Sequence, residues 1–341
     1  MEKITNSYET LFVIDPDLTE EATKALVEKF TKLIADNGEI VDTNEWGKRK
    51  LAYPINDKNE GYYVLMTFTA DPALPAEMDR QMWVAAGIRQ MYGPQIDLAS
   101  DPRWARNSGT YGEVPEVVAG ITTALVSGYQ QGTEGVQLEG VSLSIKHFPG
   151  DGAAENGYES HTYQGQWRIY TTPGSLEKYQ LPGFQAACDA GVSSIMPCYS
   201  RDTTDPRSVE QSYRGVVIPV DQVGSAYSET MMQDLLTEAM GFKGFINTDS
   251  GILETQTFGV ETLTMPERYA KLINNGVGAI GAGFQYEEVL AAIDQGILTV
   301  EQLGKVVASR LWREIMHRMA EELAKNGHRS YFIPCGGSNA L

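Results

Sequence analysis

Asp249 ends an apolar run in the stretch GFKGFINTDSGI, residues 241–252. The run has the composition of a short buried strand, and Gly, Ser and Thr surround the carboxylate that follows it. A carboxylate at such a place can act as a nucleophile or a general base, and it then needs a second group that supplies or removes a proton. The chemistry expected of this stretch therefore depends on a partner elsewhere in the chain.

Polar residues also follow the other apolar runs of the same region. Five runs recur between residues 90 and 284, and longer segments with helical periodicity separate them, which predicts a parallel sheet with helical crossovers. In such sheets chemistry collects where the strands end at their carboxyl termini. The residues found there are Arg103, Arg106, Lys146, His147, Tyr199 and Asp249.

Four blocks in this region resemble glycoside hydrolase family three, the β-glucosidase family, over residues 83–314. They are DLASDPRWARNSGTYGEVPE, IKHFPGDG, SIMPCYS and GFKGFINTDSG, in that order. The resemblance implies that Asp249 is the nucleophile of a retaining mechanism, with Tyr199 beside it. It also implies that Arg106, Lys146 and His147 hold the hydroxyls of a β-glucoside-type substrate.

A retaining enzyme also needs an acid to protonate the departing oxygen. One subgroup of the family carries an Asp-Ser-His on the loop after its KHFPG block, and here GDGAAENGYESH places Glu159, Ser160 and His161 at a similar position. A histidine held by a carboxylate could serve as the acid. The residues that flank these three do not otherwise match that subgroup, so we expect a solvent-exposed loop, no competent partner acid for Asp249 and an impaired enzyme.

The resemblance also implies an incomplete TIM-type β/α barrel. In the family two strand-helix units precede the DPRW block, and the first supplies a sugar-gripping aspartate, but residues 1–82 stand in their place. We therefore expect about five or six strands with open edges instead of eight.

Residues 1–82 follow a different pattern. The spacing of Ala22, Leu26, Phe30, Leu33 and Ile34 predicts a helix that Thr19 opens and Asn37-Gly38 closes. Two alternating strands follow, EIVDTNEWGKRKLAYPI and EGYYVLMTFTA, joined by NDKN. We expect an α+β unit that buries Phe12, Leu26, Phe30, Val64 and Met66.

Residues 1–81 resemble small-ribosomal-subunit protein six through YETLFVIDPDLTEEATKALVEKF, EWGKRKLAYPI and EGYYVLMTF. The resemblance implies a ferredoxin-like fold that binds ribosomal RNA through Lys48, Arg49 and Lys50; otherwise this run is the solvated face of a strand. The sequence departs from the family after Met82, so the last strand must come from RQMYGPQIDL or be absent.

The final stretch, MHRMAEELAKNGHRSYFIPCGGSNAL, resembles part of the pyridoxal-phosphate-dependent D-cysteine desulfhydrase group over residues 316–341. The lysine that binds the cofactor belongs to a part of that fold not found in this sequence. We therefore expect no pyridoxal phosphate, and a helix-strand tail over residues 315–341.

The composition is that of a globular, cytoplasmic protein. Of 341 residues 42% are hydrophobic, and there is no long apolar run that would span a membrane. Cys188, Cys198 and Cys335 have no ligand spacing, which favours reduced thiols and no metal. A net charge of −18 repels polyphosphates at long range but has no such effect on uncharged sugars.

The pieces together indicate a chimera-like chain with three regions, at 1–82, 83–314 and 315–341. The first functional hypothesis is a β-glycosidase-like hydrolase module with no cofactor. The second is a structural protein that binds ribosomal RNA through residues 1–82. A chain without function is the third.

Overall fold

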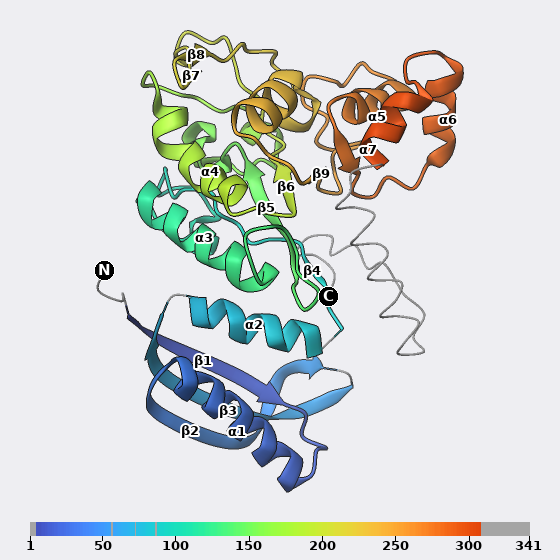
Figure 1. The fold of residues 1–341 in the computed structure, drawn as a ribbon. Helices are drawn as coiled ribbons and strands as arrows, with labels where there is room; N and C mark the ends of the chain where they lie inside the picture. The colour runs from blue at the N-terminus through green and yellow to red at the C-terminus, as the bar shows by residue number, and fades with distance from the viewer. Residues whose placement is uncertain (1–4, 56, 72, 86, 308–341) are drawn as a thin grey trace. The chain divides into compact units, whose positions relative to one another are not determined.

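The computed structural model describes residues 5–55, 57–71, 73–85 and 87–307. The chain separates into two compact units, Met1–Ala86 and Gly87–Leu341, which are called unit 1 and unit 2 below. Figure 1 shows unit 1 in blue and unit 2 from cyan to red. Each unit is described by itself.

Unit 1 contains an antiparallel sheet in the order β1-β3-β2. β1 spans Asn6–Ile14, β2 spans Gly38–Ile55 and β3 spans Lys58–Ala70. The pairing places Phe12 opposite Val64. Both side chains are buried, because alternate residues of the two strands face the same side of the sheet.

Two helices complete unit 1, α1 at Glu20–Asn37 and α2 at Ala73–Ala85. The Thr19 hydroxyl accepts a hydrogen bond from the Ala22 N–H, so the predicted cap is confirmed. The predicted helix end at Asn37 and the two predicted strands are confirmed as well. Of the five expected core residues, Phe12, Phe30, Val64 and Met66 are buried, and Leu26 packs partly buried against them.

The last strand of a ferredoxin-like sheet is not present among the described residues of unit 1. The segment expected to supply it forms β4, Gln90–Met91, which pairs in parallel with β5, Ser142–Phe148, in unit 2. The Ser142 N–H donates to the Arg89 carbonyl, and the Ser144 N–H donates to the Gly93 carbonyl. The prediction of a ferredoxin-like unit is therefore correct for three strands, and the fourth candidate segment has its backbone groups engaged elsewhere.

Unit 2 contains a five-stranded parallel sheet in the order β10-β9-β6-β5-β4. The three strands not yet named are β6 at Ser194–Pro197, β9 at Phe245–Asn247 and β10 at Val277–Ala279. All five predicted apolar runs thus contain a strand, which confirms the parallel sheet. The described strands form an open sheet with edges at β4 and β10, so a closed barrel is not formed by this part of the chain.

Helices follow the strands of unit 2 as expected for crossover connections. α3 and α4 pack against each other, and Figure 1 shows them side by side. A two-stranded hairpin of β7 (Ser212–Tyr213) and β8 (Val216–Val217) lies outside the main sheet. The α-helices are α3 at Pro115–Gln130, α4 at Leu181–Asp189, α5 at Met265–Asn274, α6 at Tyr286–Asp294 and α7 at Val300–Val307.

Other helical segments of unit 2 are short or wider than an α-helix. Short 3₁₀ turns occupy Asn107–Gly109, Asp151–Ala153, Glu155–Gly157, Tyr163–Gln166 and Ser225–Tyr227. Helical segments with wider, π-type turns occupy Leu176–Gln180 and Thr230–Ala239.

No helix in the described ranges is both long enough and apolar enough to cross a membrane. Cys188 and Cys198 are free thiols. Cys335 and the predicted helix-strand tail at 315–341 lie outside the described residues, so the desulfhydrase resemblance stays a prediction.

Candidate active site

Three neighbouring strands deliver side chains to one end of the unit 2 sheet. His147 is the next-to-last residue of β5, Tyr199 lies two residues after β6, and Asp249 lies two residues after β9. Because β5, β6 and β9 are adjacent and parallel, their carboxyl ends meet at one edge. The parallel sheet predicted from the apolar runs thus places these three residues at the same end of the sheet.

Asp249 is held as an ionised carboxylate. Its Oδ1 accepts a 2.7 Å hydrogen bond from the Ser250 N–H, and its Oδ2 lies 3.5 Å from Nε2 of His161. Burial alone would raise the pKa of Asp249, but the His161 contact, the Ser250 N–H and the charge of His147 outweigh burial and hold this pKa well below its usual value. The carboxylate is therefore charged at any physiological pH.

His161 lies between two carboxylates. Nδ1 is 2.7 Å from Oε2 of Glu159, while Nε2 faces Asp249. The contacts with Asp249 and Glu159 raise the pKa of His161 to about 9, although partial burial opposes the shift. The imidazole is therefore protonated at neutral pH, and its Nε2–H group faces the carboxylate of Asp249.

Glu159 is itself oriented from the other side. Nη1 of Arg106 lies 3.5 Å from its Oε1, and the His161 N–H of the main chain donates to its Oε2. Burial opposes ionisation of Glu159, but His161 and Arg106 lower its pKa. The structure thus connects Arg106 to the site through Glu159, a link that spacing in the sequence does not reveal.

Tyr199 covers the opposite side of His161. Their rings meet edge to face with centroids 5.1 Å apart, and the tyrosine oxygen accepts a 2.8 Å hydrogen bond from the Gly251 N–H. Burial and the charge of Asp249 raise the pKa of Tyr199 well above its usual range. Its hydroxyl therefore stays protonated and available as a donor beside the carboxylate.

His147 and Lys146 are anchored by residues that the sequence reasoning did not single out. Nδ1 of His147 lies 2.8 Å from Oδ2 of the fully buried Asp97, and Nζ of Lys146 lies 5.3 Å from the centre of the Tyr92 ring. The Tyr92 hydroxyl in turn donates to the Thr248 carbonyl, next to Asp249. Asp97 could have been found from the sequence, because it is a carboxylate at the end of the first apolar run.

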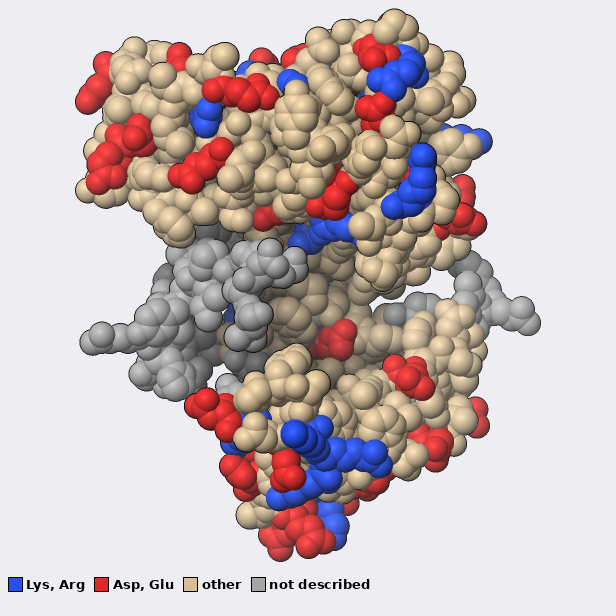
Figure 2. All heavy atoms as spheres, turned by 180° about the vertical axis from the view of Figure 1, so that it is seen from behind, with Lys and Arg blue, Asp and Glu red and all other residues tan. Residues whose placement is uncertain are grey.

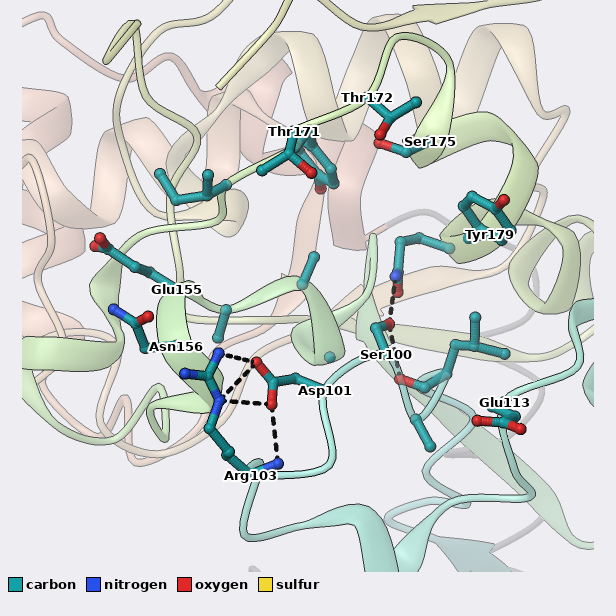
Figure 3. A pocket seen from close by; sticks show the side chains of 18 of the residues that line it. Ser100, Asp101, Arg103, Glu113, Glu155, Asn156, Thr171, Thr172, Ser175 and Tyr179 are labelled. Carbon is teal, nitrogen blue, oxygen red and sulfur yellow. Dashed lines mark hydrogen bonds and ion pairs between the residues drawn. The ribbon is translucent and has the colours of Figure 1, made fainter. Parts of the chain in front are cut away.

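A cavity of about 840 Å³ opens on unit 2, and Asp249, His161 and Tyr199 do not line it. Figure 3 shows Asp101 paired with Arg103 on one side, Tyr179 on another, and the hydroxyls of Thr171, Thr172 and Ser175 nearby. Arg103 was expected among the strand-end residues, but its guanidinium binds Asp101. None of Asp249, His161, Glu159, Tyr199 and His147 lines this cavity, so it is distinct from the cluster around Asp249.

The cluster around Asp249 combines a charged carboxylate with a charged imidazolium at short range. Such a pair can supply a nucleophile and a proton to the same bond. No group of three or more His, Cys, Asp or Glu side chains in the described ranges is arranged to hold a metal ion.

The predicted RNA-binding residues lie on β2 in unit 1. Lys48, Arg49 and Lys50 are exposed, and the Arg49 guanidinium lies 5.2 Å from the centre of the Trp46 ring. Trp46 stacks on Tyr63 of β3. Figure 2 shows adjoining Lys and Arg side chains on one face of this unit, with acidic side chains around them.

Comparison with known families divides the chain into two parts. A family model described as "Ribosomal protein S6" matches residues 7–91, and one described as "Glycosyl hydrolase family 3 N terminal domain" matches residues 73–311. The two matches overlap over α2 and β4, where unit 1 gives way to unit 2.

Curated relatives of the second part are β-glucosidases. "Beta-glucosidase C" of Emericella nidulans is 32% identical over 250 residues, covering 70% of this chain and 38% of that protein. "Periplasmic beta-glucosidase/beta-xylosidase" of Dickeya chrysanthemi is 31% identical over 253 residues, covering 68% and 37%. The chain therefore spans less than two fifths of the length of these two relatives.

Relatives of the first part are ribosomal. "Small ribosomal subunit protein bS6" of Clostridium novyi is 53% identical over 83 residues, which are 24% of this chain and 87% of that protein. Among solved structures, the β-glucosidase from Listeria innocua in complex with isofagomine matches with a TM-score of 0.60 and 23% identity, covering 76% of this chain and 33% of that one. This last likeness concerns the fold alone.

Proposed function

Because this chain belongs to glycosyl hydrolase family 3 over residues 73–311 and to the ribosomal protein S6 family over residues 7–91, we propose that it carries a retaining β-glycosidase site in unit 2. Asp249 is the proposed nucleophile. His161, held by Glu159, is the proposed general acid and base. Arg106, Lys146, His147 and Tyr199 are the proposed sugar-binding residues.

The observation that carries the proposal is the 3.5 Å separation between Nε2 of His161 and Oδ2 of Asp249. The sequence favoured an exposed loop and no competent acid; the short distance between these two side chains supports the other candidate, His161. The chain turns after Ser160, so that the His161 ring packs against Tyr199 and reaches the end of β9.

The first chemical step follows from this pair. An oxygen of Asp249 attacks the anomeric carbon, the bond to the leaving oxygen breaks, and His161 gives its Nε2 proton to that oxygen. The sugar is then esterified to Asp249. In the second step His161 takes a proton from water as the water attacks the same carbon, which releases the sugar and restores both residues.

The substrate class is proposed from the relatives, whose names include β-glucosidase and β-xylosidase. The sheet has open edges at β4 and β10, whereas the family has further strands. One of those further strands carries an aspartate that binds the sugar in the family. Binding should therefore be weak, and activated aryl β-glycosides should be better substrates than disaccharides.

Covalent trapping tests the proposal directly. The intact chain is incubated with a 2-deoxy-2-fluoro-β-glucoside that carries a dinitrophenyl leaving group, and the site of the added mass is found by peptide mass spectrometry. Labelling of Asp249 supports the proposal. Labelling of another residue, or release of dinitrophenol that persists in Asp249→Asn, would remove Asp249 as nucleophile. Asp205→Asn, a change of a half-exposed carboxylate paired with Arg207, is the matched control.

A second function is favoured by unit 1. Its identity of 53% to a ribosomal protein and the exposed run Lys48, Arg49 and Lys50 support binding to ribosomal RNA. This proposal also places the chain in the cytoplasm, where ribosomes are. A filter-binding titration with small-subunit ribosomal RNA at several salt concentrations tests it, because phosphate contacts give a salt-dependent affinity.

A further inference from the structure

Asp151 is a fully buried carboxyl beneath the loop that carries Glu159 and His161. It lies in the 3₁₀ turn Asp151–Ala153 directly after the KHFPG segment, and its own N–H donates a 2.7 Å hydrogen bond to Oδ1 of Asp97. The main chain at this point is thus fixed to the same carboxylate that orients His147.

The side chain of Asp151 is bound by two serine hydroxyls. Ser160 donates to Oδ2 at 2.7 Å, and Ser200 lies with its hydroxyl 3.0 Å from Oδ1. The Ser200 hydroxyl has a second acceptor, the Gly165 carbonyl at 3.1 Å. The hydrogen bond from Ser160 joins Asp151 to the middle of the segment Glu159–His161. Burial raises the pKa of Asp151, and the hydrogen bond from Ser160 is among the interactions that oppose this shift.

Ser160 differs from both of its neighbours. It is 2% exposed, whereas the side chains of Glu159 and His161 are 25% and 42% exposed. The loop therefore turns one residue inward, to Asp151, and presents the residues before and after it to the region around Asp249. A tether at the central residue limits how far both flanking side chains can move.

We propose that Asp151 is a positioning residue, which fixes Ser160 and thereby sets the distance of His161 from Asp249. It touches neither the substrate nor the reacting atoms. The inference deepens the proposed glycosidase function and rests on that function only for its activity measurement, because the position of His161 can be measured without turnover.

Three variants separate positioning from general stability. Ser160→Ala deletes the tether, which is the one side-chain hydrogen bond that Ser160 makes within the described part of the chain. Asp151→Asn keeps an oxygen that accepts from Ser160, and Ser200 can then donate to Gly165, so this variant should preserve the tether. Ser142→Ala is the matched control, because it also removes a buried hydroxyl, which is hydrogen-bonded to Ser193. Ser142 is the first residue of β5, at the end of the strand away from the site.

The first measurement is the pKa of His161 by NMR, with its resonance identified from its loss in His161→Asn. In the intact protein and in Ser142→Ala we expect a value near 9, and in Ser160→Ala a fall of at least about one unit toward the ordinary value of roughly 6.5. Asp151→Asn should stay closer to the intact protein than Ser160→Ala does. An unchanged value in Ser160→Ala would overturn the proposal.

The second measurement is the ratio of kcat/KM for a nitrophenyl β-glucoside to that for an alkyl β-glucoside. Misplacing the acid should raise this ratio at least about tenfold in Ser160→Ala, because only the alkyl substrate needs the proton, and Asp151→Asn should restore it. Equal loss on both substrates would show a merely structural role. If the intact protein has no turnover, the proposed function fails, and the NMR titration alone decides the positioning role. Should Ser160→Ala not fold, Asp151→Ala takes its place, because it deletes the same hydrogen bond from the other side and leaves Ser200 its Gly165 acceptor.

Discussion

Nε2 of His161 lies 3.5 Å from Oδ2 of Asp249, on a loop and a strand end that are far apart in the sequence. Neither residue is unusual by itself. Together they form an ion pair whose two members have opposite pKa shifts, since each charge stabilises the other. Groups with pKa values driven apart in this way are the expected signature of a nucleophile and an acid.

Removing the proposed nucleophile should abolish turnover. Asp249→Asn keeps the size of the side chain but cannot attack the anomeric carbon, and loss of a covalent nucleophile can cost on the order of 10⁶ in kcat. Steady-state hydrolysis of a nitrophenyl β-glucoside measures the loss. Asp205→Asn should keep the activity of the intact chain. An Asp249→Asn protein within tenfold of that activity would refute the assignment.

Removing the proposed general acid should affect different substrates unequally. In His161→Ala we expect cellobiose hydrolysis to fall by roughly 10²–10⁴, because the sugar leaving group needs a proton. Dinitrophenolate leaves without one, so its release in the first step should fall far less. Thr162→Ala, on the same loop, tests for nonspecific disturbance, because within the described ranges the Thr162 hydroxyl donates only to the Glu159 carbonyl. Equal loss on both substrates would show that His161 is not the acid.

The pH dependence should follow His161. Its pKa of about 9 predicts that kcat/KM for cellobiose stays level through neutral pH and falls as the pH rises through 9. Glu159→Gln removes one of the groups that raise this pKa, so the fall should move to lower pH. A profile that does not move in Glu159→Gln would contradict the pairing.

The same shift makes a prediction about stability. The folded pKa of His161 is raised above the unfolded value of roughly 6.5, so the protonated ring stabilises the fold. This contribution is complete below about pH 6.5 and is lost as the pH rises through 9. Thermal unfolding of the intact chain and of His161→Ala between pH 6 and 10 should therefore converge at the alkaline end. A gap that widens with pH would contradict this sign.

The core of unit 1 should depend on Met66. This side chain is 0% exposed on β3, and Met66→Ala should lower the free energy of unfolding of unit 1 by about 2–5 kcal/mol through lost burial and a residual cavity. Hydrogen exchange of the β1 and β3 amides in the full chain measures this change. Val41→Ala, at a position 67% exposed on β2, should change it by far less. Equal effects would place Met66 outside a packed core.

RNA binding should show in the salt dependence. Replacing Lys48, Arg49 and Lys50 with Gln should reduce the slope of log affinity against log salt concentration by roughly one for each lost phosphate contact. Replacing Lys24, Lys29 and Lys32 on α1 removes the same charge from another exposed surface, and the slope should then stay the same. Equal losses from both triple variants would mean that only net charge matters.

The sequence determined the local elements because their signals are local. The five apolar runs of unit 2 contain strands, because the backbone N–H and C=O groups of a short buried segment need hydrogen-bond partners, which a sheet supplies. Thr19 capped α1 because its hydroxyl needs only the N–H three residues ahead. Asp249 and Tyr199 were placed correctly at strand ends because parallel strands share one direction.

Tertiary structure decided what depends on contacts between distant segments. The segment around β4 could have completed the sheet of unit 1, and only its pairing with β5 shows that it does not, because both sheets offer similar backbone hydrogen bonds. The sequence left Glu159 and His161 as candidates beside the alternative of an exposed loop. The approach of His161 to Asp249 depends on a turn held by the hydrogen bond between the buried Ser160 and Asp151. The spacing of residues in the sequence does not predict this bond, because hydrogen bonds between buried side chains form only once the surrounding chain has excluded water.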